Sequence, residues 1–226
     1  MIFSHPINSY LTGFTDHHSH ILPGVDDGVK KMEVSLNVLE KYEQLGIAEV
    51  WCTPHIMEDI PNTTEGLRQR FAELCEAYKG PIKLNLAAEY MMDGLFEERL
   101  EQNDLLTIGH EGNQLLVETS YYTPPMDMDQ ILIQIKRKGY HPLLAHPERY
   151  VYMNKERYHE LKADGIRFQL NLSSMAGAYG PEAKQKARWL LRKNYYNFAG
   201  SDLHSIRNIS FWSAKAPRGF RRLLAP

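Results

Sequence analysis

Histidines and carboxylates that follow short apolar runs are the residues of this chain best suited to do chemistry. His18 and His20 are two residues apart, so both imidazoles point to one side if the segment leaves a strand, as a pair of metal ligands requires. Similar side chains follow other apolar runs, and the full set of candidate ligands is His18, His20, Asp27, His55, Glu89, Glu118, His146, Asp202 and His204. These side chains converge on one point if the strands before them form a barrel.

The candidate set combines imidazole nitrogens with carboxylate oxygens and contains no thiolate. This mixture suits Mn²⁺, Fe²⁺ or Zn²⁺ better than Mg²⁺ or Ca²⁺ alone, and it exceeds what one ion can use, so we expect two or three ions. Such ions turn water into hydroxide near neutral pH and stabilise both oxygens of an in-line displacement. The set therefore predicts hydrolysis of a phosphoester.

Other histidines and acidic residues lack this placement, and a single histidine is ordinarily a hydrogen-bonded core or surface residue. The histidines predicted to be structural are His5, His17, His110, His141 and His159. The acidic residues predicted to be hydrogen-bonding or exposed groups are Asp26, Glu111 and Glu148.

Two arginines are candidates for binding a phosphate group. Arg149 and Arg207 each follow a candidate ligand, His146 or His204, by three residues, and the arginine fork binds phosphate through two parallel hydrogen bonds. The alternative for each arginine is a surface salt bridge. Asp202 is either a general acid that protonates the leaving oxygen or a metal ligand only.

The sequence excludes the competing cysteine mechanism. A cysteine phosphatase needs an arginine six residues after its nucleophile, but Glu58 and Pro81 occupy those places after Cys52 and Cys75. The chain also lacks a GxSxG elbow, a GxxxxGK[ST] phosphate loop and a GxGxxG turn. Hydrolysis through bound cations remains the expected mechanism.

Short apolar runs alternate with helical patterns along the whole chain. Strands are predicted at residues 13–17, 48–52, 83–88, 114–118, 141–145, 167–171 and 196–200. Helices are predicted at residues 32–45, 67–78, 128–138, 155–163 and 182–193, the last entered by Pro181. This alternation predicts an α/β fold with a parallel sheet, in which about seven units form an incomplete relative of the β/α barrel over residues 1–226 as one domain.

Composition agrees with one enzyme-sized domain. The chain has 226 residues, 43% of them hydrophobic, and a formal charge of −2, so it offers no basic field for nucleic acid. Two cysteines without CxxC spacing fit a reducing compartment. We find no leader pattern and no apolar run of the roughly 18 residues that a membrane span needs, and we therefore expect a cytoplasmic protein. The basic, proline-containing stretch 213–226 is expected to be a partly ordered, solvated tail.

Six short motifs together resemble one protein family. They are DHHSHILPGVDDG at 16–28, TPH at 53–55, AEY at 88–90, LVE at 116–118, AHPERY at 145–150 and SDLH at 201–204. In this order they resemble the bacterial manganese-dependent protein-tyrosine phosphatases of the PHP (polymerase and histidinol phosphatase) superfamily, which accompany capsule and exopolysaccharide synthesis. The resemblance runs from Thr15 to Arg207.

The resemblance implies a fold, a cofactor and a substrate. The fold would be the distorted seven-stranded, TIM-like PHP barrel, with three metal ions, Mn²⁺ before Fe²⁺ or Zn²⁺, on the nine ligands. The substrate would be phosphotyrosine on an autophosphorylating tyrosine kinase that governs polymer length, with Arg149 and Arg207 binding the phosphate. The chain departs from the family at residues 208–213, where the amphipathic closing helix is not evident. The oligomeric state and the kinase stay open.

Three alternatives compete with this interpretation. A small-molecule phosphatase, such as one acting on histidinol phosphate, would use the same metal ligands. The residues that discriminate are tyrosines after Glu118 and His146, which could form aromatic walls for a phenyl ring or pack as ordinary loops: Tyr121, Tyr122, Tyr150 and Tyr152. A non-catalytic module with a degenerate site is disfavoured because all nine positions are filled, and a nuclease is disfavoured because no basic track is present.

Overall fold

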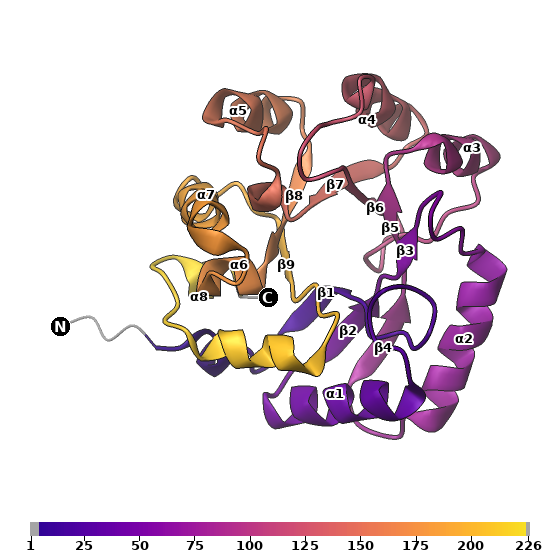
Figure 1. The fold of residues 1–226 in the computed structure, drawn as a ribbon, viewed down its shortest axis with the longest axis vertical. Helices are drawn as coiled ribbons and strands as arrows, with labels where there is room; N and C mark the ends of the chain where they lie inside the picture. The colour runs from indigo at the N-terminus through magenta and orange to yellow at the C-terminus, as the bar shows by residue number, and fades with distance from the viewer. Residues whose placement is uncertain (1–4, 225–226) are drawn as a thin grey trace.

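Parallel strands form the centre of the molecule, and helices lie around the outside (Figure 1). The computed structural model describes residues 5–224. Its strands are β1 Thr15–Ser19, β2 Glu49–Cys52, β3 His55–Ile56, β4 Lys83–Leu86, β5 Glu89–Met91, β6 Gln114–Glu118, β7 His141–Ala145, β8 Arg167–Asn171 and β9 Phe198–Gly200. They pair in parallel in two curled sheets, β1-β2-β4 and β3-β5-β6-β7-β8-β9. The predicted α/β class and parallel pairing are confirmed.

Two of the predicted strands, at residues 48–52 and 83–88, are each followed after a break by a short strand that was not predicted, β3 and β5. Residues 53–54 separate β2 from β3, and residues 87–88 separate β4 from β5. The interruptions lie side by side, because β2 pairs with β4 before them and β3 pairs with β5 after them. Pro54 has no backbone N–H to donate to a neighbouring strand, which favours a break there. Past the break, His55 lies opposite Glu89 in the register, so the two candidate ligands are neighbours.

The first strand lies beside the last. The backbone N–H of Asp202 donates to the carbonyl of His18 at 2.7 Å, and the N–H of His20 donates to the carbonyl of Leu203 at 3.1 Å. These hydrogen bonds join segments that are far apart in the sequence, and they bring the ligands of the N-terminal motif next to those of the C-terminal one.

Helices cover the outer faces of the curled sheets. They are α1 Met32–Gln44, α2 Thr64–Ala77, α3 Gly94–Gln102, α4 Met128–Arg137, α5 Lys155–Ala163, α6 Leu172–Ala176, α7 Gly180–Arg192 and α8 Phe220–Leu224, with 3₁₀ helices η1 Ile7–Tyr10, η2 Pro147–Arg149 and η3 Ile206–Ser213. In α4, Ile131, Leu132 and Ile135 form the buried stripe that the helical spacing predicts. All five predicted helices are present. No helix in the part of the chain that the structure describes is long and apolar enough to cross a membrane.

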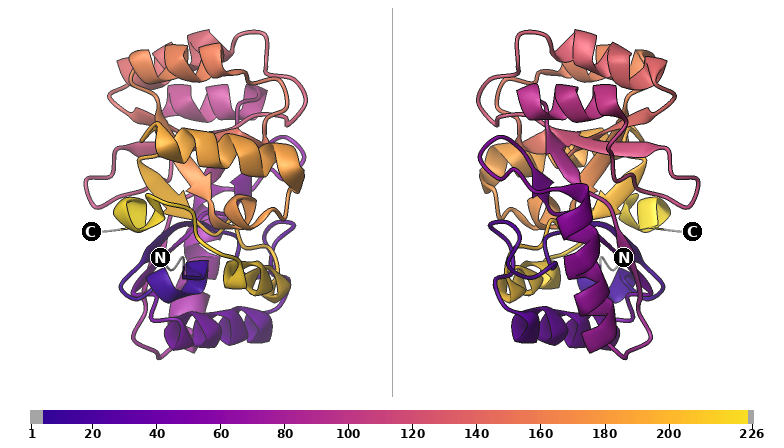
Figure 2. Two further views of the ribbon diagram at one scale, coloured as in Figure 1. Left: turned by 90° about the vertical axis from the view of Figure 1, so that its left-hand side faces the viewer. Right: turned by 90° about the vertical axis from the view of Figure 1, so that its right-hand side faces the viewer.

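Helix α3 was not predicted. The side chain of Asp93 caps its N-terminus by accepting a hydrogen bond from the N–H of Phe96 at 2.9 Å, and Phe96 and Leu100 are buried. The helix lies beside α4 in the arrangement of Figure 1, and Figure 2 shows the same layer from both sides. An aspartate three residues before an apolar Phe is a typical helix start, so Asp93 and Phe96 could have indicated this helix from the sequence.

The C-terminal segment differs from the predicted solvated tail. Residues 206–213 form η3, and Trp212 is fully buried, with its ring centroid 5.8 Å from that of Tyr42. Phe220 is also fully buried, whereas Arg221 and Arg222 of α8 are exposed. Trp212 holds residues 206–213 against the fold, so a closing helix is present where the sequence showed none. Phe220 holds the described part of the predicted tail, residues 213–224, and the basic residues that suggested a tail lie on its outer surface. Residues 225–226 lie outside the described part.

Candidate metal centre

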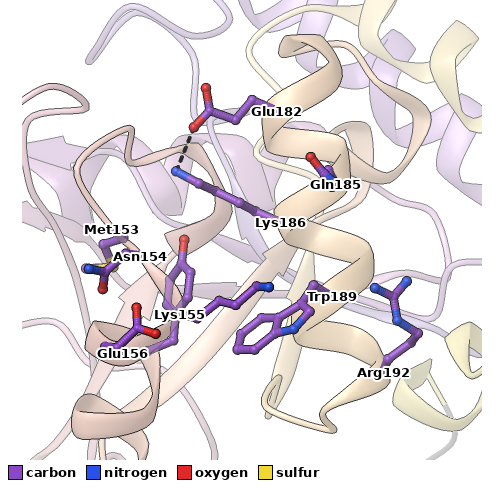
Figure 3. Close-up of a pocket in the computed structure, with 10 residues that line it drawn as sticks. Met153, Asn154, Lys155, Glu156, Glu182, Gln185, Lys186, Trp189 and Arg192 are labelled. Atoms are coloured by element: carbon purple, nitrogen blue, oxygen red, sulfur yellow. Dashed lines mark ion pairs between the residues drawn. The ribbon is translucent and has the colours of Figure 1, made fainter.

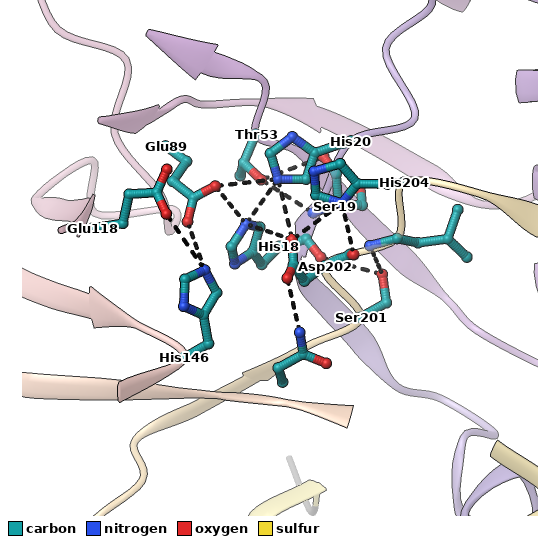
Figure 4. A network of polar contacts seen from close by, with 12 residues as sticks. His18, Ser19, His20, Thr53, Glu89, Glu118, His146, Ser201, Asp202 and His204 are labelled. Atoms are coloured by element: carbon teal, nitrogen blue, oxygen red, sulfur yellow. Dashed lines mark hydrogen bonds and ion pairs between the residues drawn. The ribbon is translucent and has the colours of Figure 1, made fainter. Parts of the chain in front are cut away.

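The nine side chains predicted as metal ligands lie together, and we call them the metal centre. Each belongs to at least one of three clusters whose ligand atoms lie within 4.8 Å of one another: His20, Asp27, His55 and His204; His18, Glu89, His146 and Asp202; and His55, Glu89 and Glu118. They come from β1, β3, β5, β6 and the segments that follow β1, β7 and β9. Figure 4 shows the labelled imidazoles and carboxylates turned toward one another.

Glu89 lies where the clusters meet. Its Oε2 is 3.0 Å from His18 Nε2, 3.2 Å from His20 Nε2 and 3.2 Å from His55 Nδ1. Yet Glu89 Oε2 and His55 Nδ1 are buried atoms that make no hydrogen bond among the described residues. Buried polar atoms ordinarily have a hydrogen-bond partner. Divalent cations bound between these converging atoms would satisfy them. The donor set of imidazole and carboxylate groups fits such ions.

Two ligands occupy a backbone conformation that is unusual for residues with a side chain. His146 has φ 33° and Asp202 has φ 50°, both in the left-handed region. Each such residue costs on the order of 1–3 kcal/mol, and strain of this kind clusters at functional sites. Here it directs both side chains into the second cluster at the ends of β7 and β9.

Glycine is required where two backbone segments, β9 and the loop after β1, approach the candidate ligands. A Cβ on Gly200 would lie 2.5 Å from His18 Cβ, and a Cβ on Gly28 would lie 2.3 Å from the carbonyl oxygen of His20. The backbone can therefore pass this close to both histidines only without a side chain.

Hydrogen bonds to the outer ring nitrogens orient the first two histidines. His20 Nδ1 lies 2.8 Å from Asp26 Oδ2, and His18 Nδ1 lies 3.0 Å from Gln169 Oε1. Both Nε2 atoms consequently face the centre. Metal-binding histidines are commonly oriented in this way, by a hydrogen-bond partner on the other ring nitrogen. Asp26 also accepts from the N–H groups of Gly28 and His55, which confirms the prediction that it is a hydrogen-bonding group. Gln169 was not predicted.

The electrostatics favour positive charge in the centre. Burial lowers the pKa of His18, but the carboxylates of Glu89 and Asp202 outweigh this effect and raise it to about 9. Burial raises the pKa of Glu89, whereas His18 and His55 together hold it well below its usual range. A hydrogen bond from His204 is the largest effect on Asp27 and lowers the pKa of that carboxyl. The carboxylates of Glu89 and Asp27 are thus favoured in the ionised form that binds cations.

The centre opens to solvent on one side. The side chain of Asp27 is 65% exposed and that of His204 is 29% exposed, whereas Glu89 and Asp202 are 0% and 1% exposed. The first cluster therefore faces the solvent, and the second lies beneath it. A substrate would enter past Asp27 and His204.

Arg149 reaches the second cluster from η2. Its Nη1 donates to Asp202 Oδ2 at 2.6 Å, and its Cζ lies over the rings of Tyr121 and Tyr179 at 4.3 and 4.0 Å from their centroids. Burial lowers the pKa of the guanidinium, but Asp202 and the other acidic and tyrosine neighbours together outweigh burial and raise it. Tyr179 was not predicted, because nothing in its local sequence distinguishes it.

Both oxygens of Asp202 are engaged. Oδ1 lies 3.5 Å from His18 Nε2 and 3.3 Å from His20 Nε2, and Oδ2 accepts from Arg149 and from Asn171 Nδ2 at 2.8 Å. Burial raises the pKa of Asp202, but His18 and the other neighbours hold it well below its usual range. This arrangement suits a ligand and does not prepare Asp202 to donate a proton. Asn171 was not predicted, although it ends a predicted strand, because its contact with Asp202 joins residues far apart in the sequence.

Two predicted substrate-binding residues lie differently from the expectation. Arg207 is exposed on η3, and no hydrogen bond or ion pair of its side chain is present within residues 5–224. Tyr150 is fully buried, with its ring 6.2 Å from that of Tyr121 and 5.6 Å from that of Tyr152. It lies too deep to form an open aromatic wall and instead packs against Tyr121. Tyr122 is 75% exposed.

Residues predicted to be structural lie outside the three clusters. Glu148 accepts from the N–H of Asn171 and the hydroxyl of Tyr196, and none of the five remaining histidines joins a metal cluster among the described residues. Cys52 is buried, which raises the pKa of its thiol, and Cys75 is exposed on α2. Neither thiol joins the metal centre.

A groove of about 500 Å³ lies outside the centre, between α5 and α7. Figure 3 shows its lining, with Trp189 and Lys186 on α7 facing Lys155 on α5. Lys186 Nζ donates to the carbonyl of Tyr150 at 2.7 Å. The groove therefore adjoins the segment that follows Arg149.

Comparison with known proteins places these observations in one family. The tyrosine-protein phosphatase YwqE of Bacillus subtilis (strain 168) is 28% identical over 207 residues, which are 89% of this chain and 81% of that protein. The tyrosine-protein phosphatase CpsB of Streptococcus pneumoniae is 28% identical over 204 residues, covering 84% and 83%.

Solved structures agree with the sequence comparison. A chain from the crystal structures of YwqE and CpsB, described as unique metal-dependent tyrosine phosphatases, has a TM-score of 0.78 at 26% identity and covers 86% of this chain and 81% of its own length. The lactonase Lmo2620 of Listeria monocytogenes matches in fold alone, at a TM-score of 0.55 and 12% identity, over 96% of this chain and 88% of its own. The model of the family described as "Capsular polysaccharide synthesis, CpsB/CapC" matches residues 14–211, and the chain belongs to this family.

Proposed function

We propose that this protein is a metal-dependent phosphatase that hydrolyses phosphotyrosine on a protein of capsule or exopolysaccharide synthesis. The observation that carries the proposal is the convergence of nine ligand side chains in three clusters, with Arg149 bonded to Asp202 at their edge. The relatives named above are tyrosine-protein phosphatases. The most suitable substrate protein is an autophosphorylating tyrosine kinase, as the family resemblance implies.

The fold and the cofactor follow from the same ligands. The hydrogen bonds between the first and last strands support a closed, seven-stranded PHP barrel formed by residues 1–226 as one domain. Three clusters, with Glu89 and His55 each shared by two, support two or three ions. Mn²⁺ is the ion we propose first, before Fe²⁺ or Zn²⁺. Divalent cations bound there would activate water and neutralise charge on the phosphate.

The protein's own side chains bind and orient the phosphoester. Arg149 has N–H donors beyond the one that Asp202 accepts, and these can bind phosphate oxygens. We propose Arg207 as a second phosphate-binding residue, which its exposed position on η3 leaves free to turn toward a substrate. Asp27 and His204 line the entrance.

The metal centre favours an aryl ester as its substrate, because of the leaving group that such an ester releases. Asp202 is engaged through both oxygens, so a leaving group that departs readily as an anion suits the centre best. The phenol of tyrosine has a pKa of about 10, far below that of an aliphatic alcohol. Phosphotyrosine therefore suits the centre better than phosphoserine or the aliphatic ester of histidinol phosphate.

The test is metal analysis of protein purified without chelator, followed by assays on a phosphotyrosine peptide and on histidinol phosphate. We expect bound Mn²⁺, Fe²⁺ or Zn²⁺ and a preference for the peptide. A clear preference for histidinol phosphate would contradict the substrate assignment, and full activity in excess chelator would contradict the metal-dependent mechanism.

A further inference from the structure

Tyr179 is the N-terminal flanking residue of α7, and its ring lies against Arg149. The Cζ atom of Arg149 is 4.0 Å from the centroid of the Tyr179 ring and 4.3 Å from that of Tyr121. The two rings come from different elements, the segment after β6 and the start of α7. The guanidinium is therefore held by two parts of the fold at once.

This contact orients the guanidinium without using its hydrogen-bond donors. A cation attracted to the face of an aromatic ring keeps every N–H free, and guanidinium has five of them in a rigid plane. One nitrogen of Arg149, Nη1, donates to Asp202. The rings keep the plane of the guanidinium fixed, and donors remain for the oxygens of a phosphate.

The Tyr179 ring is itself held in place. Asn171 Nδ2 lies 3.2 Å from the hydroxyl of Tyr179 and 2.8 Å from Asp202 Oδ2. Tyr179, Asn171, Asp202 and Arg149 thus form a closed ring of contacts that links the metal centre to the start of α7.

Helix α7 also holds the segment that carries Arg149. Lys186, less than two turns after the helix begins, donates to the carbonyls of Tyr150 and Val151 at 2.7 and 3.3 Å. Figure 3 shows Lys186 reaching from α7 across the upper end of the groove. The helix that presents Tyr179 is thereby fixed to the chain directly after Arg149, which sets the spacing between the ring and the guanidinium.

We propose that Tyr179 is a positioning residue for phosphate recognition, which holds Arg149 in the orientation that binds the phosphate group. The inference rests on the proposed function, because the orientation of Arg149 matters to catalysis only if the substrate carries a phosphate. In this proposal Tyr179 acts only by positioning Arg149 and does not contact the reacting atoms.

The first test compares Tyr179→Leu with Tyr179→Phe on p-nitrophenyl phosphate, using the metal-loaded enzyme. The leucine variant loses the aromatic face, and we expect its kcat/KM to fall about tenfold, mainly through KM, with a similar weakening of competitive inhibition by inorganic phosphate. The phenylalanine variant keeps the face and should stay within about threefold of wild type. Tyr195→Leu, past the far end of α7 and packed on Trp189, is the matched control and should retain wild-type kinetics.

The second test asks whether Tyr179 acts through Arg149. In an Arg149→Ala background, Tyr179→Leu should cause no further loss of kcat/KM, since there is no guanidinium to orient. The same tenfold loss in both backgrounds, or a fall in the metal content of Tyr179→Leu, would overturn the proposal in favour of a general structural role. Wild-type kinetics of Tyr179→Leu would also overturn it. If Tyr179→Leu does not fold, Tyr179→Met replaces the ring with a flexible side chain that has no aromatic face and is judged by the same criteria.

The third test does not depend on activity. In Zn²⁺-loaded protein, the side-chain N–H resonance of Arg149, assigned by its loss in Arg149→Lys, should be shifted upfield by the two rings. The shift should persist in Tyr179→Phe and diminish in Tyr179→Leu. An unshifted resonance in wild type would overturn the contact itself. A shifted resonance in a protein that hydrolyses no aryl phosphate would instead contradict the proposed function.

Discussion

The carboxylate of Asp202 joins the metal centre to Arg149. Its Oδ1 faces the imidazole nitrogens of His18 and His20, and its Oδ2 accepts a hydrogen bond from Arg149 Nη1 at 2.6 Å. One residue thus fixes the distance between the candidate ligands and the arginine that we propose binds phosphate. Its left-handed backbone, φ 50°, is the local cost of this double contact.

Metal removal should abolish catalysis, because the proposed mechanism uses no side-chain nucleophile. We expect a chelator to eliminate hydrolysis of an aryl phosphate and added Mn²⁺ to restore it. Cys75→Ser is the control for a thiol mechanism, since Cys75 is an exposed thiol on α2, and it should retain wild-type activity. Activity that survives chelation but is lost in this variant would contradict the mechanism.

Arg149→Ala should weaken phosphate recognition while the metals stay in place, because guanidinium cannot bind a cation. We expect kcat/KM for an aryl phosphate to fall tenfold or more, about 1.4 kcal/mol, with unchanged metal content. Arg149→Lys should recover little, since a lysine ammonium has neither the planar fork nor the same stacking on Tyr121 and Tyr179. Wild-type kinetics in Arg149→Ala would refute this role.

Arg207→Ala tests the second proposed phosphate-binding residue. If the exposed side chain turns toward bound substrate, kcat/KM should fall tenfold or more without a change in metal content. Arg221→Ala, another exposed arginine near the C-terminus, is the matched control and should leave the kinetics unchanged. If Arg207→Ala has the same kinetics as Arg221→Ala, Arg207 does not bind the phosphate.

Gln169→Leu should lower metal affinity although Gln169 is not a ligand. Its Oε1 lies 3.0 Å from His18 Nδ1 and accepts from the N–H of His146 at 3.2 Å. Loss of such a partner typically costs 10–100-fold in metal affinity. Titration of chelator-treated protein with Zn²⁺ measures the effect, and an affinity equal to that of wild type would show that Gln169 does not orient the histidines.

Sequence reasoning located the metal centre because its signals are local. Each ligand follows or lies within a short strand. Strands β6, β7 and β8 have the predicted bounds, because β6 and β7 contain short apolar runs and β8 alternates apolar with polar residues. The two-residue strand β3 carries too little pattern to be recognised. Tyr179, Gln169 and Asn171 were missed because their roles depend on contacts with residues distant in the sequence, such as Asp202 and His18.

Two neighbouring aromatic residues of η3 should differ in how much they stabilise the fold. Trp212 is fully buried, whereas its neighbour Phe211 is 42% exposed. Trp212→Ala should lower the free energy of unfolding by about 3–5 kcal/mol, and Phe211→Ala should change it by about 0.5 kcal/mol or less. Urea denaturation measures both. Equal, small effects would show that the burial of Trp212 does not hold η3 against the fold.

Hydrolysis of two peptides of identical sequence, one with phosphotyrosine and one with phosphoserine, tests the central claim most directly. Both should be assayed with Mn²⁺ and again with excess chelator. The account predicts a higher kcat/KM for the phosphotyrosine peptide and loss of that activity in chelator, because the centre binds cations and favours a phenolic leaving group. Equal hydrolysis of the two peptides would contradict the assignment to phosphotyrosine, and hydrolysis that persists in chelator would contradict the metal centre as the site of catalysis.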